Sequence, residues 1–351
     1  FRKYFSAIPF YLFVFPVVWL ALAAPVRVFV FGMDVVTAGA ILITPTWLRQ
    51  LGALGGVSAL SLFLFFVNAV LFLLLTKKIS RHGAFYAAVI VVCLVGYGVW
   101  AAASFSLPPP ALRVALLQGG TPDESNEGPL DADPYYRDLV QEALRQNADV
   151  IVFPGQRNMR VVTPEKLAQE NTSFIEAPEL QKRVVVFGAP MRINGLVYSA
   201  LVAIQNGEIA GMYHKRKLMF VSEYRPRGPL GSVFPQDVYG RLSPGMGEDG
   251  SFIPALGIDA RICNEELYQS LALKDAEKAG RILLYSGSDA AFANEAVFRF
   301  TLRMVQLRAV QTRKWLFRAN RTGISAIINP RGDIVAQLPK GAHGLIVFPA
   351  P

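Results

Sequence analysis

Long apolar runs fill about the first hundred residues of the chain, whereas short apolar runs alternate with amphipathic patterns in the rest. A transmembrane helix needs about 20 mostly apolar residues, and three stretches approach or meet this length: residues 8–24, 57–75 and 84–104. The first stretch lacks a convincing small-residue cleavage site and more apolar stretches follow it, so we expect a span there and not a cleaved signal peptide. The pattern predicts that residues 1–105 form an N-terminal bundle of transmembrane helices, with three or four spans.

A possible fourth span, residues 28–43, is interrupted by charge. Asp34 falls inside it, Pro45 closes it, and Trp47 and Arg49 follow. Charged groups are costly in the lipid core, and non-helical backbone is tolerated there only where protein or water surrounds it. The stretch therefore fits a re-entrant or interfacial segment as well as a span.

Lys and Arg residues near the ends of the spans predict their orientation, because cytoplasmic loops carry an excess of positive charge. With three spans, one side of the membrane carries Arg2, Lys3, Lys77, Lys78 and Arg81, and the other side carries Arg27 and Arg49. With four spans, one side carries Arg27, Lys77, Lys78 and Arg81, and the other side carries Arg2, Lys3 and Arg49. Both counts place residues 77–81 in the cytoplasm and direct the last span outward. We expect residues 106–351 to lie outside the cytoplasm.

A proline-rich linker follows the last long apolar run. Three consecutive prolines, Pro108 to Pro110, cannot continue a helix, so residues 106–111 are predicted as a linker and residues 112–351 as one compact domain. Strand-like and helical patterns alternate in this domain, which is typical of a layered α/β fold. The predicted strands are residues 112–117, 149–153, 183–187, 197–204, 209–213, 258–263, 282–286, 316–320 and 324–329, and the predicted helices are residues 135–146, 265–279 and 295–312.

The last of these helices has one regular face. Phe298, Leu302, Val305, Ala309 and Thr312 recur on this face at helical spacing, while Arg299, Arg303 and Arg313 lie off it. The pattern predicts a packed helix with a basic outer face. Beyond it, residues 329–333 contain a proline and a glycine between two apolar runs, which predicts a hairpin turn.

Composition supports an association with membranes and argues against several other classes of protein. Of 351 residues, 52% are hydrophobic and 17% charged, and the mean hydropathy is +0.34, which is too apolar for an ordinary soluble protein. The 35 Lys and Arg residues exceed the 26 Asp and Glu residues but are scattered, so we expect anionic lipid and not nucleic acid as a partner. Cys93 and Cys263 lie in different surroundings, so neither a disulfide framework nor a multi-cysteine zinc site is expected. No metal and no cofactor are expected.

Cys263 is the best candidate nucleophile. It ends an apolar strand and comes directly before a predicted helix that begins near Glu265. Backbone N–H groups and the positive end of a helix favour a thiolate and a developing oxyanion at such a turn. The alternative is a small buried apolar residue, which free cysteines often are, and position alone leaves both open.

A basic cluster at residues 213–218 is the second candidate. Lys215 follows an alternating strand, so it either turns inward as a fixed cation beside a thiolate or stays in a solvated basic loop. A pair of Cys263 with His214 is also open, although no local signature supports it.

Several motifs of the second half occur in the order and spacing of a known family: residues 112–118, 150–154, 213–218 with 223–226, 262–265, and 308–311 with 320–325. They resemble the nitrilase (carbon–nitrogen hydrolase) superfamily over about residues 112–350. Within it the chain is most similar to the apolipoprotein N-acyltransferase branch, and the conjugal-transfer TraB proteins are the subgroup most similar to it. The resemblance implies a nitrilase-like αββα sandwich fused to transmembrane helices, in a bacterial inner membrane with the sandwich on the periplasmic side.

The resemblance also implies roles for four residues. Cys263 is the implied nucleophile, and Lys215 is the implied triad lysine that stabilises the tetrahedral intermediate together with a backbone N–H near Asn264. Glu223 matches an acidic residue at the active site of this branch. Glu265 matches the acidic residue two positions after the nucleophile, which orients its loop. For both carboxylates the alternative is an ion pair with nearby arginines.

One position departs from the family. The family places its general-base glutamate directly after the proline that ends the second strand, but here Pro154 is followed by Gly155 and Gln156. A general base typically contributes about 10²–10⁴-fold in rate. Three explanations stay open: a natural replacement that abolished or altered the chemistry, a substitute base such as Glu223 or Glu265, or an engineered inactive variant.

Two functions of different classes follow. The first is a thiol-dependent acyltransferase or amidase, in which Cys263 takes an acyl group from a phospholipid or a membrane-anchored acyl or amide substrate and passes it to an amine or to water. The second is a non-catalytic membrane-anchored binding or assembly protein that has a conjugation-machinery protein as its partner. Gly155 favours the second function, and the presence of Cys263, Lys215, Glu223 and Glu265 favours the first. The membrane branch of the family implies a monomer.

Overall fold

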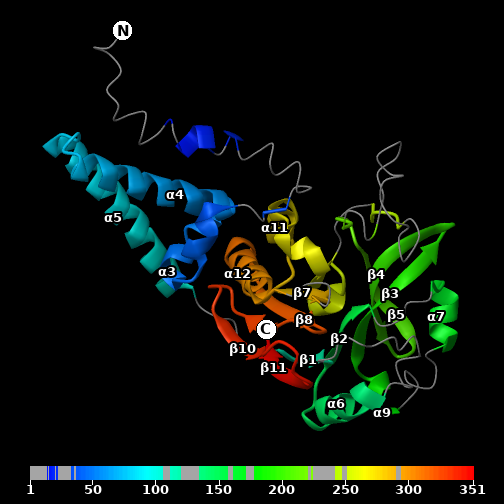
Figure 1. Ribbon diagram of the computed structural model, residues 1–351. Helices are drawn as coiled ribbons and strands as arrows, with labels where there is room; N and C mark the ends of the chain where they lie inside the picture. Colours follow the sequence, from blue (N-terminus) through cyan, green and yellow to red (C-terminus); the bar gives the residue numbers. More distant parts are fainter. Residues whose placement is uncertain are drawn as a thin grey trace.

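Two β-sheets pack face to face in the second half of the chain, and helices cover the outer face of each sheet (Figure 1). The computed structural model describes residues 14, 16–19, 21–22, 33–34, 37–105, 111–119, 134–156, 161–170, 178–219, 223, 242–246, 251–289 and 294–351. Most of the predicted span at residues 8–24 and of the linker at residues 106–111 therefore lies outside the described residues.

The first sheet has the strand order β11-β1-β2-β3-β4-β5. Strands β1, β2 and β3 run parallel, whereas β11, β4 and β5 pair antiparallel with their neighbours. The bounds are β1 Leu112–Gln118, β2 Val150–Gln156, β3 Val184–Ile193, β4 Leu196–Gln205, β5 Glu208–His214 and β11 Gly344–Ala350, with helices α6 Pro134–Arg145, α7 Pro164–Glu170 and α9 Pro178–Gln181 on this side of the molecule.

The second sheet has the strand order β10-β9-β8-β7-β6. Strands β6, β7 and β8 run parallel, and β9 and β10 continue the sheet antiparallel. The bounds are β6 Ile258–Ile262, β7 Ile282–Gly287, β8 Trp315–Asn320, β9 Ser325–Ile328 and β10 Ile334–Leu338, with helices η3 Pro254–Leu256, η4 Cys263–Leu267, α11 Gln269–Ala276 and α12 Glu295–Thr312.

Buried apolar side chains fill each interface between these layers. Val152, Ile262, Leu284 and Phe317 belong to the core between the two sheets; Leu139, Val140, Ile151 and Phe153 to the core between the first sheet and its helices; and Leu283, Leu302, Val305 and Leu316 to the core between the second sheet and α12. Burial of apolar surface drives such layering. The predicted α/β fold with an αββα sandwich is confirmed.

Each predicted strand is present, and so is the hairpin turn between β9 and β10, where the Asn329 N–H donates to the Asp333 carbonyl at 2.9 Å. The predicted helix at residues 265–279 is wrong in its extent. A short 3₁₀ helix, η4, is followed by Tyr268 in an extended conformation, and only then does α11 begin. Tyr268 is buried, so its packing interrupts what the sequence pattern presents as one helix.

The two helices α4 Gly52–Leu75 and α5 Arg81–Ser104 are each long and apolar enough to cross a membrane. Helix α4 becomes regular after a break at Gly55 and Gly56, where Gly56 has a φ of 64°, and its regular part matches the predicted span at residues 57–75. Many large apolar side chains on the two helices are exposed, among them Leu71, Phe72, Leu75, Phe85, Tyr86, Val92 and Trp100.

The doubtful fourth stretch is not a spanning helix where it is described. Its last residues form a 3₁₀ helix of six residues, η2 Ala38–Ile43, which is followed by the short helix α3 Thr46–Arg49. At about 2.0 Å per residue, η2 is too short to cross a bilayer. The interfacial or re-entrant alternative therefore fits the described part of this stretch.

The helix α12 is covered on both sides. The N-terminal segment, meaning the described residues between 33 and 60, packs against the face that points away from the sheet (Figure 1). Met304 and Leu307 on that face join a buried apolar cluster with Ile43, Leu51 and Leu60. The predicted basic outer face is therefore only partly correct. Arg299 and Arg303 are exposed, whereas most residues of the second half of α12 are buried.

Candidate active site

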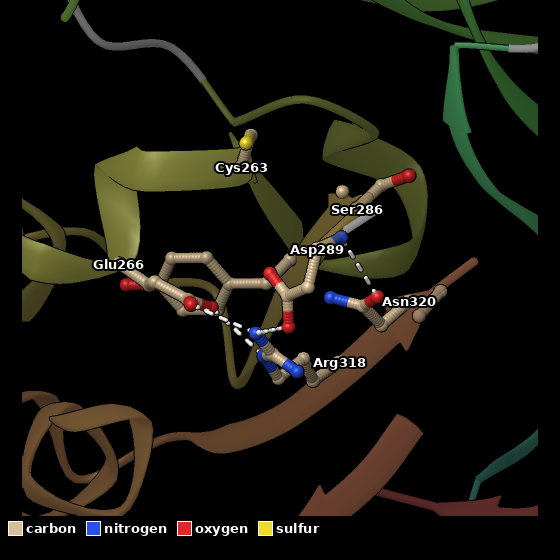
Figure 2. A pocket seen from close by; sticks show the side chains of 9 residues that line it. Cys263, Glu266, Ser286, Asp289, Arg318 and Asn320 are labelled. Carbon is tan, nitrogen blue, oxygen red and sulfur yellow. Dashed lines mark hydrogen bonds and ion pairs between the residues drawn. The ribbon is translucent and has the colours of Figure 1, made fainter. Parts of the chain in front are cut away.

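The carboxyl ends of the parallel strands β6, β7 and β8 bring Cys263 next to polar groups of neighbouring strands. Ile262, which precedes Cys263, pairs with Ser286, and Gly287 pairs with Asn320. A small pocket lies at this edge, and Figure 2 shows Cys263 at its rim. Ligands of α/β sheets commonly bind outside the carboxyl ends of the strands, so this edge is the candidate active site.

Cys263 has an unusual backbone conformation. Its φ is 52°, in the left-handed region that non-glycine residues rarely adopt and that often marks functional sites. Gly287 of β7 lies directly against it, because a Cβ on Gly287 would be 3.0 Å from the Cys263 Cα. The sharp turn between β6 and η4 therefore places the thiol at a corner, and a side chain at position 287 would press on the backbone of this turn.

Glu265 fixes this turn to the loop that carries Lys215. Its Oε2 accepts a hydrogen bond from the Ile262 N–H at 2.8 Å, and its Oε1 accepts from the backbone N–H groups of Arg216 and Lys217 at 2.8 and 3.1 Å. The Tyr213 hydroxyl lies 2.9 Å from both carboxylate oxygens. The orienting role of Glu265 stays a prediction, and its partners among the described residues are backbone N–H groups and the Tyr213 hydroxyl.

Lys215 is buried beside the nucleophile turn, with 1% of its side chain exposed, and its Nζ lies 2.7 Å from Oε1 of Glu223. The other carboxylate oxygen of Glu223 accepts from the Met219 N–H at 2.6 Å. A solvated basic loop is therefore the wrong alternative for Lys215. The neighbouring residue His214 has a different contact: its ring stacks on Tyr198, with the ring centroids 4.6 Å apart.

Cys263 and Lys215 are close enough for each charge to affect the other. Burial raises the pKa of the Cys263 thiol, and the Lys215 cation offsets only part of this increase, while Glu223 adds to it. Burial lowers the pKa of Lys215, but a Cys263 thiolate, the charge and hydrogen bond of Glu223 and the charge of Glu265 together outweigh burial and raise it. Lys215 is thus a permanent cation at neutral pH, whereas the thiol stays largely protonated and needs a proton acceptor to react.

A buried ionic cluster below Cys263 was missed at the sequence level. Arg318 lies between the carboxylates of Glu266 and Asp289, with its Nη2 at 2.8 Å from Glu266 Oε1 and 3.0 Å from Asp289 Oδ2 (Figure 2). Burial raises the pKa of Glu266, and the charge of Arg318 opposes this. The sequence does carry one signal, because Arg318 interrupts the apolar strand of residues 315–320 and so requires a buried partner.

Gly155 lies against Gly287 and, as a glycine, presents no side chain to the site. Its φ is 63°, and a Cβ added to it would be 3.2 Å from the Gly287 carbonyl oxygen. Its N–H donates to the Ser286 hydroxyl at 3.0 Å, and that hydroxyl in turn donates to the Phe153 carbonyl at 3.3 Å. The structure therefore brings position 155 to the same strand edge as Cys263, but backbone groups and a serine hydroxyl occupy this wall.

No group of three or more His, Cys, Asp or Glu side chains that could hold a metal ion occurs among the residues that the structure describes. The charged side chains near Cys263 instead form ion pairs with one another: Arg318 with Glu266 and Asp289, and Lys215 with Glu223. The arrangement can hold a thiol, a buried cation and nearby backbone N–H groups around an acyl carbonyl, which is the equipment of covalent acyl transfer.

Comparisons with known proteins agree with this geometry. Two curated relatives, both named apolipoprotein N-acyltransferase, come from Synechocystis sp. and Pseudomonas paraeruginosa. The first is 29% identical over 307 residues, with 81% of this chain and 57% of the relative covered. The second is 27% identical over 323 residues, with 85% of this chain and 60% of the relative covered. The chain thus matches 57% and 60% of the lengths of these relatives.

The fold is also found among solved structures. Saccharomyces cerevisiae Nit3, a member of the nitrilase superfamily, superposes with a TM-score of 0.51 at 18% sequence identity, over 71% of this chain and 93% of Nit3. A family model described as carbon-nitrogen hydrolase matches residues 113–349. This match includes both sheets and every residue of the candidate active site, and the chain belongs to the carbon–nitrogen hydrolase family.

Proposed function

We propose that the chain is a membrane-anchored thiol acyltransferase or amidase in which Cys263 forms an acyl thioester. One observation carries the proposal: Cys263 occupies a left-handed turn that Glu265 joins to the loop of Lys215, a buried cation that is paired with Glu223 and whose charge acts on the thiol. A buried cation next to a thiol stabilises negative charge far better than an exposed one does. The name of the curated relatives, apolipoprotein N-acyltransferase, supports transfer of the acyl group to an amine.

The reaction runs in two halves. The Cys263 sulfur attacks the carbonyl carbon of the acyl donor, and Lys215 and nearby backbone N–H groups stabilise the tetrahedral oxyanion. The bond to the leaving alcohol or amine breaks, and the leaving group takes up the proton that the thiol has given up. An acceptor amine then attacks the thioester, which forms an amide and returns a proton to the thiol; with water as the acceptor the product is a carboxylic acid. This is a ping-pong sequence.

Two carboxylates were the candidates for a substitute base, and their hydrogen bonds separate them. The oxygens of Glu265 accept from three backbone N–H groups and from the Tyr213 hydroxyl. Protonation of Glu265 would disrupt the loop that holds Lys215. Glu223 instead bonds to Lys215 itself, and its charge already affects the Cys263 thiol. We assign Glu223 as the better acceptor for the thiol proton.

The substrate we propose is a phospholipid or another acyl or amide compound anchored in a membrane. Helices α4 and α5 expose a large apolar surface, which only lipid or a partner protein would cover. The turn between them carries Lys77, Lys78 and Arg81, and positive charge favours the cytoplasmic side. We infer a multi-pass protein of the bacterial inner membrane, monomeric, with the nitrilase-like domain in the periplasm.

A second candidate function is favoured by Gly155. Without the family's glutamate at this position, the chain could serve as a non-catalytic membrane-anchored protein that binds or assembles partners, as the resemblance to conjugal-transfer proteins suggests. In that case the partner is a component of a conjugation apparatus, and the groups around Cys263 are retained for folding alone.

Intact-mass spectrometry distinguishes the two functions. The detergent-solubilised chain is incubated with a phospholipid or a short acyl ester, with Cys263→Ala as the control. We expect an added acyl mass on the parent chain and none on Cys263→Ala. If the parent gains no acyl group but a Gly155→Glu variant does, the acyltransferase proposal fails for this chain and the binding or assembly function takes its place.

A further inference from the structure

The N-terminal segment contacts the turn that carries Cys263. The backbone N–H of Asp34 donates to the carbonyl of Leu267 at 2.9 Å, and Leu267 is the last residue of η4. The Asp34 carboxylate lies 2.8 Å from Nη2 of Arg308, and the two side chains are 2% and 0% exposed. The charge of Asp34, which interrupts an apolar stretch of the sequence, is thus paired with the buried Arg308 of the nitrilase-like domain.

Arg308 joins the same ion pair to the nucleophile turn. Its Nε donates to the carbonyl of Glu266 at 3.0 Å, one residue before Leu267. The last carbonyls of any helix lack partners within it, and 3₁₀ helices have poorer hydrogen-bond geometry and are rarely long. The two carbonyls at the end of η4 are therefore held by the Asp34 backbone and by an arginine that Asp34 fixes.

We propose that Asp34 is a positioning residue for Cys263. Through Asp34 and Arg308, the N-terminal segment fixes the C-terminal end of η4. The strained left-handed conformation of Cys263, the first residue of η4, depends on these contacts. The contacts of Asp34 and Arg308 with η4 thus couple this part of the N-terminal segment to the geometry of the nucleophile. The proposal rests on the proposed function only for the identity of Cys263 as the reacting atom.

A second link between the same two segments provides a matched control. Arg49 donates to the carbonyls of Ile43 and Gly332 and lies 3.5 Å from Asp333. Like Asp34, it is a buried charge that joins the N-terminal segment to the nitrilase-like domain, but its partner in that domain is the hairpin turn at residues 329–333 and not η4. Arg49→Met therefore removes a buried charge between the same two segments and leaves the contacts of Asp34 and Arg308 with η4 in place.

The test measures the reactivity of Cys263 directly, in the 351-residue chain in detergent. A Cys93→Ser background leaves Cys263 as the only thiol, because the sequence has two cysteines. The rate of alkylation by iodoacetamide is followed by intact mass across a pH series for the parent, Asp34→Asn and Arg49→Met. Acylation by a short acyl ester is measured in parallel on the same samples.

In Asp34→Asn we expect the pH midpoint of alkylation to fall toward that of an exposed cysteine, because a relaxed η4 releases the thiol from burial. We expect acylation to slow by about tenfold or more, since small displacements of a reacting group are costly. Asp34→Glu, which keeps the charge, should recover part of both effects. Arg49→Met should keep the midpoint of the parent.

Equal midpoints in Asp34→Asn, Arg49→Met and the parent overturn the proposal. Alkylation requires no acyl donor, so a parent that alkylates but never acylates contradicts the proposed function and leaves the role of Asp34 measurable. If Asp34→Asn does not fold, as judged by near-ultraviolet circular dichroism, Arg308→Lys replaces it. That variant keeps a cation for Asp34 but cannot also reach the Glu266 carbonyl, and an unchanged midpoint there overturns the proposal equally.

Discussion

The two walls of the candidate active site differ in how their polar groups are used. On the nucleophile wall, formed by Cys263, Lys215, Glu223 and Glu265, charged side chains hold one another and the backbone in place. On the wall formed by Gly155, Ser286 and Gly287, the Gly155 N–H donates to the Ser286 hydroxyl, and none of the three residues carries a charged side chain. A site can therefore hold a thiol and a cation in position while it has no carboxylate at position 155, where the family has its general base. The presence of a nucleophile alone does not predict the rate of turnover.

The largest effect is expected on the nucleophile wall, from Lys215→Met. Loss of a charge that stabilises an oxyanion typically lowers rates by about 10²–10³-fold, and we expect a loss of that order in the acylation of Cys263. Burial raises the pKa of Cys263 and the Lys215 cation lowers it, so the variant should also move the pH midpoint of alkylation upward. Both quantities are measured by intact mass across a pH series.

Lys215→Arg is the control for this prediction, because it keeps the charge but alters its shape. It should retain the midpoint of the parent even if acylation falls. A Lys215→Met protein that folds and alkylates with an unchanged midpoint would show that Lys215 does not act on the thiol, and the contrast between the two walls would then lose its basis.

A gain is expected on the other wall from Gly155→Glu. A general base contributes about 10²–10⁴-fold, and we expect an increase in acylation on the order of 10², near the lower limit of that range. We expect the increase in acylation to stay near this lower limit, because the left-handed φ of 63° at position 155 disfavours a side chain by about 1–2 kcal/mol. The measured quantity is the acylation rate, and the variant should unfold at a lower temperature than the parent.

Gly155→Gln carries the same backbone cost and nearly the same bulk but no base. Acylation should rise in Gly155→Glu and stay at or below the parent rate in Gly155→Gln. Equal rates in the two variants would mean that the missing carboxylate is not what limits this site, and that Glu223 or another group already supplies the base.

A smaller effect on acylation is expected from Glu265→Gln, which disturbs the hydrogen bonds between the two loops of the nucleophile wall. The amide has one accepting oxygen, so at least one buried N–H, that of Ile262 or those of Arg216 and Lys217, loses its partner. A buried unsatisfied donor costs about 1–3 kcal/mol, and we expect this loss in chemical denaturation together with about a tenfold slower acylation.

The exposed residue Glu295, which pairs with Arg299 on the surface of α12, gives the control. Glu295→Gln makes the same chemical change far from the site and should leave the denaturation midpoint unchanged. If Glu265→Gln behaves in the same way, Glu265 does not hold the loop of Lys215.

Prediction from the sequence succeeded where one local pattern determines the structure. The apolar runs predicted each expected strand of the sandwich, and the run at residues 258–263 placed Cys263 at the end of β6. The extent of η4 was not predictable, because Tyr268 ends it through tertiary packing and not through a local stop signal. The burial of Lys215 depended likewise on Glu223 and Glu265, whose contacts cross between separate loops. The arginine partner of Asp34 lies 274 residues away in sequence, and the carboxylate partners of Arg318 lie 29 and 52 residues away. The spacing of apolar residues along the chain does not predict such pairs.

The smallest effect on chemistry is expected from Ser286→Ala, which is the most direct test of the wall around Gly155. Removal of the hydroxyl leaves the buried Gly155 N–H without the partner it now has at 3.0 Å, and we expect a loss of about 1 kcal/mol in the free energy of unfolding. The hydroxyl already donates to the Phe153 carbonyl, so it is engaged in holding β2 against β7 and not in proton transfer. Acylation of Cys263 should therefore change by less than about threefold, because under 1 kcal/mol of transition-state stabilisation is at stake. A loss of acylation as large as that of Lys215→Met, in a folded Ser286→Ala protein, would place chemistry on both walls and would contradict the distinction between them.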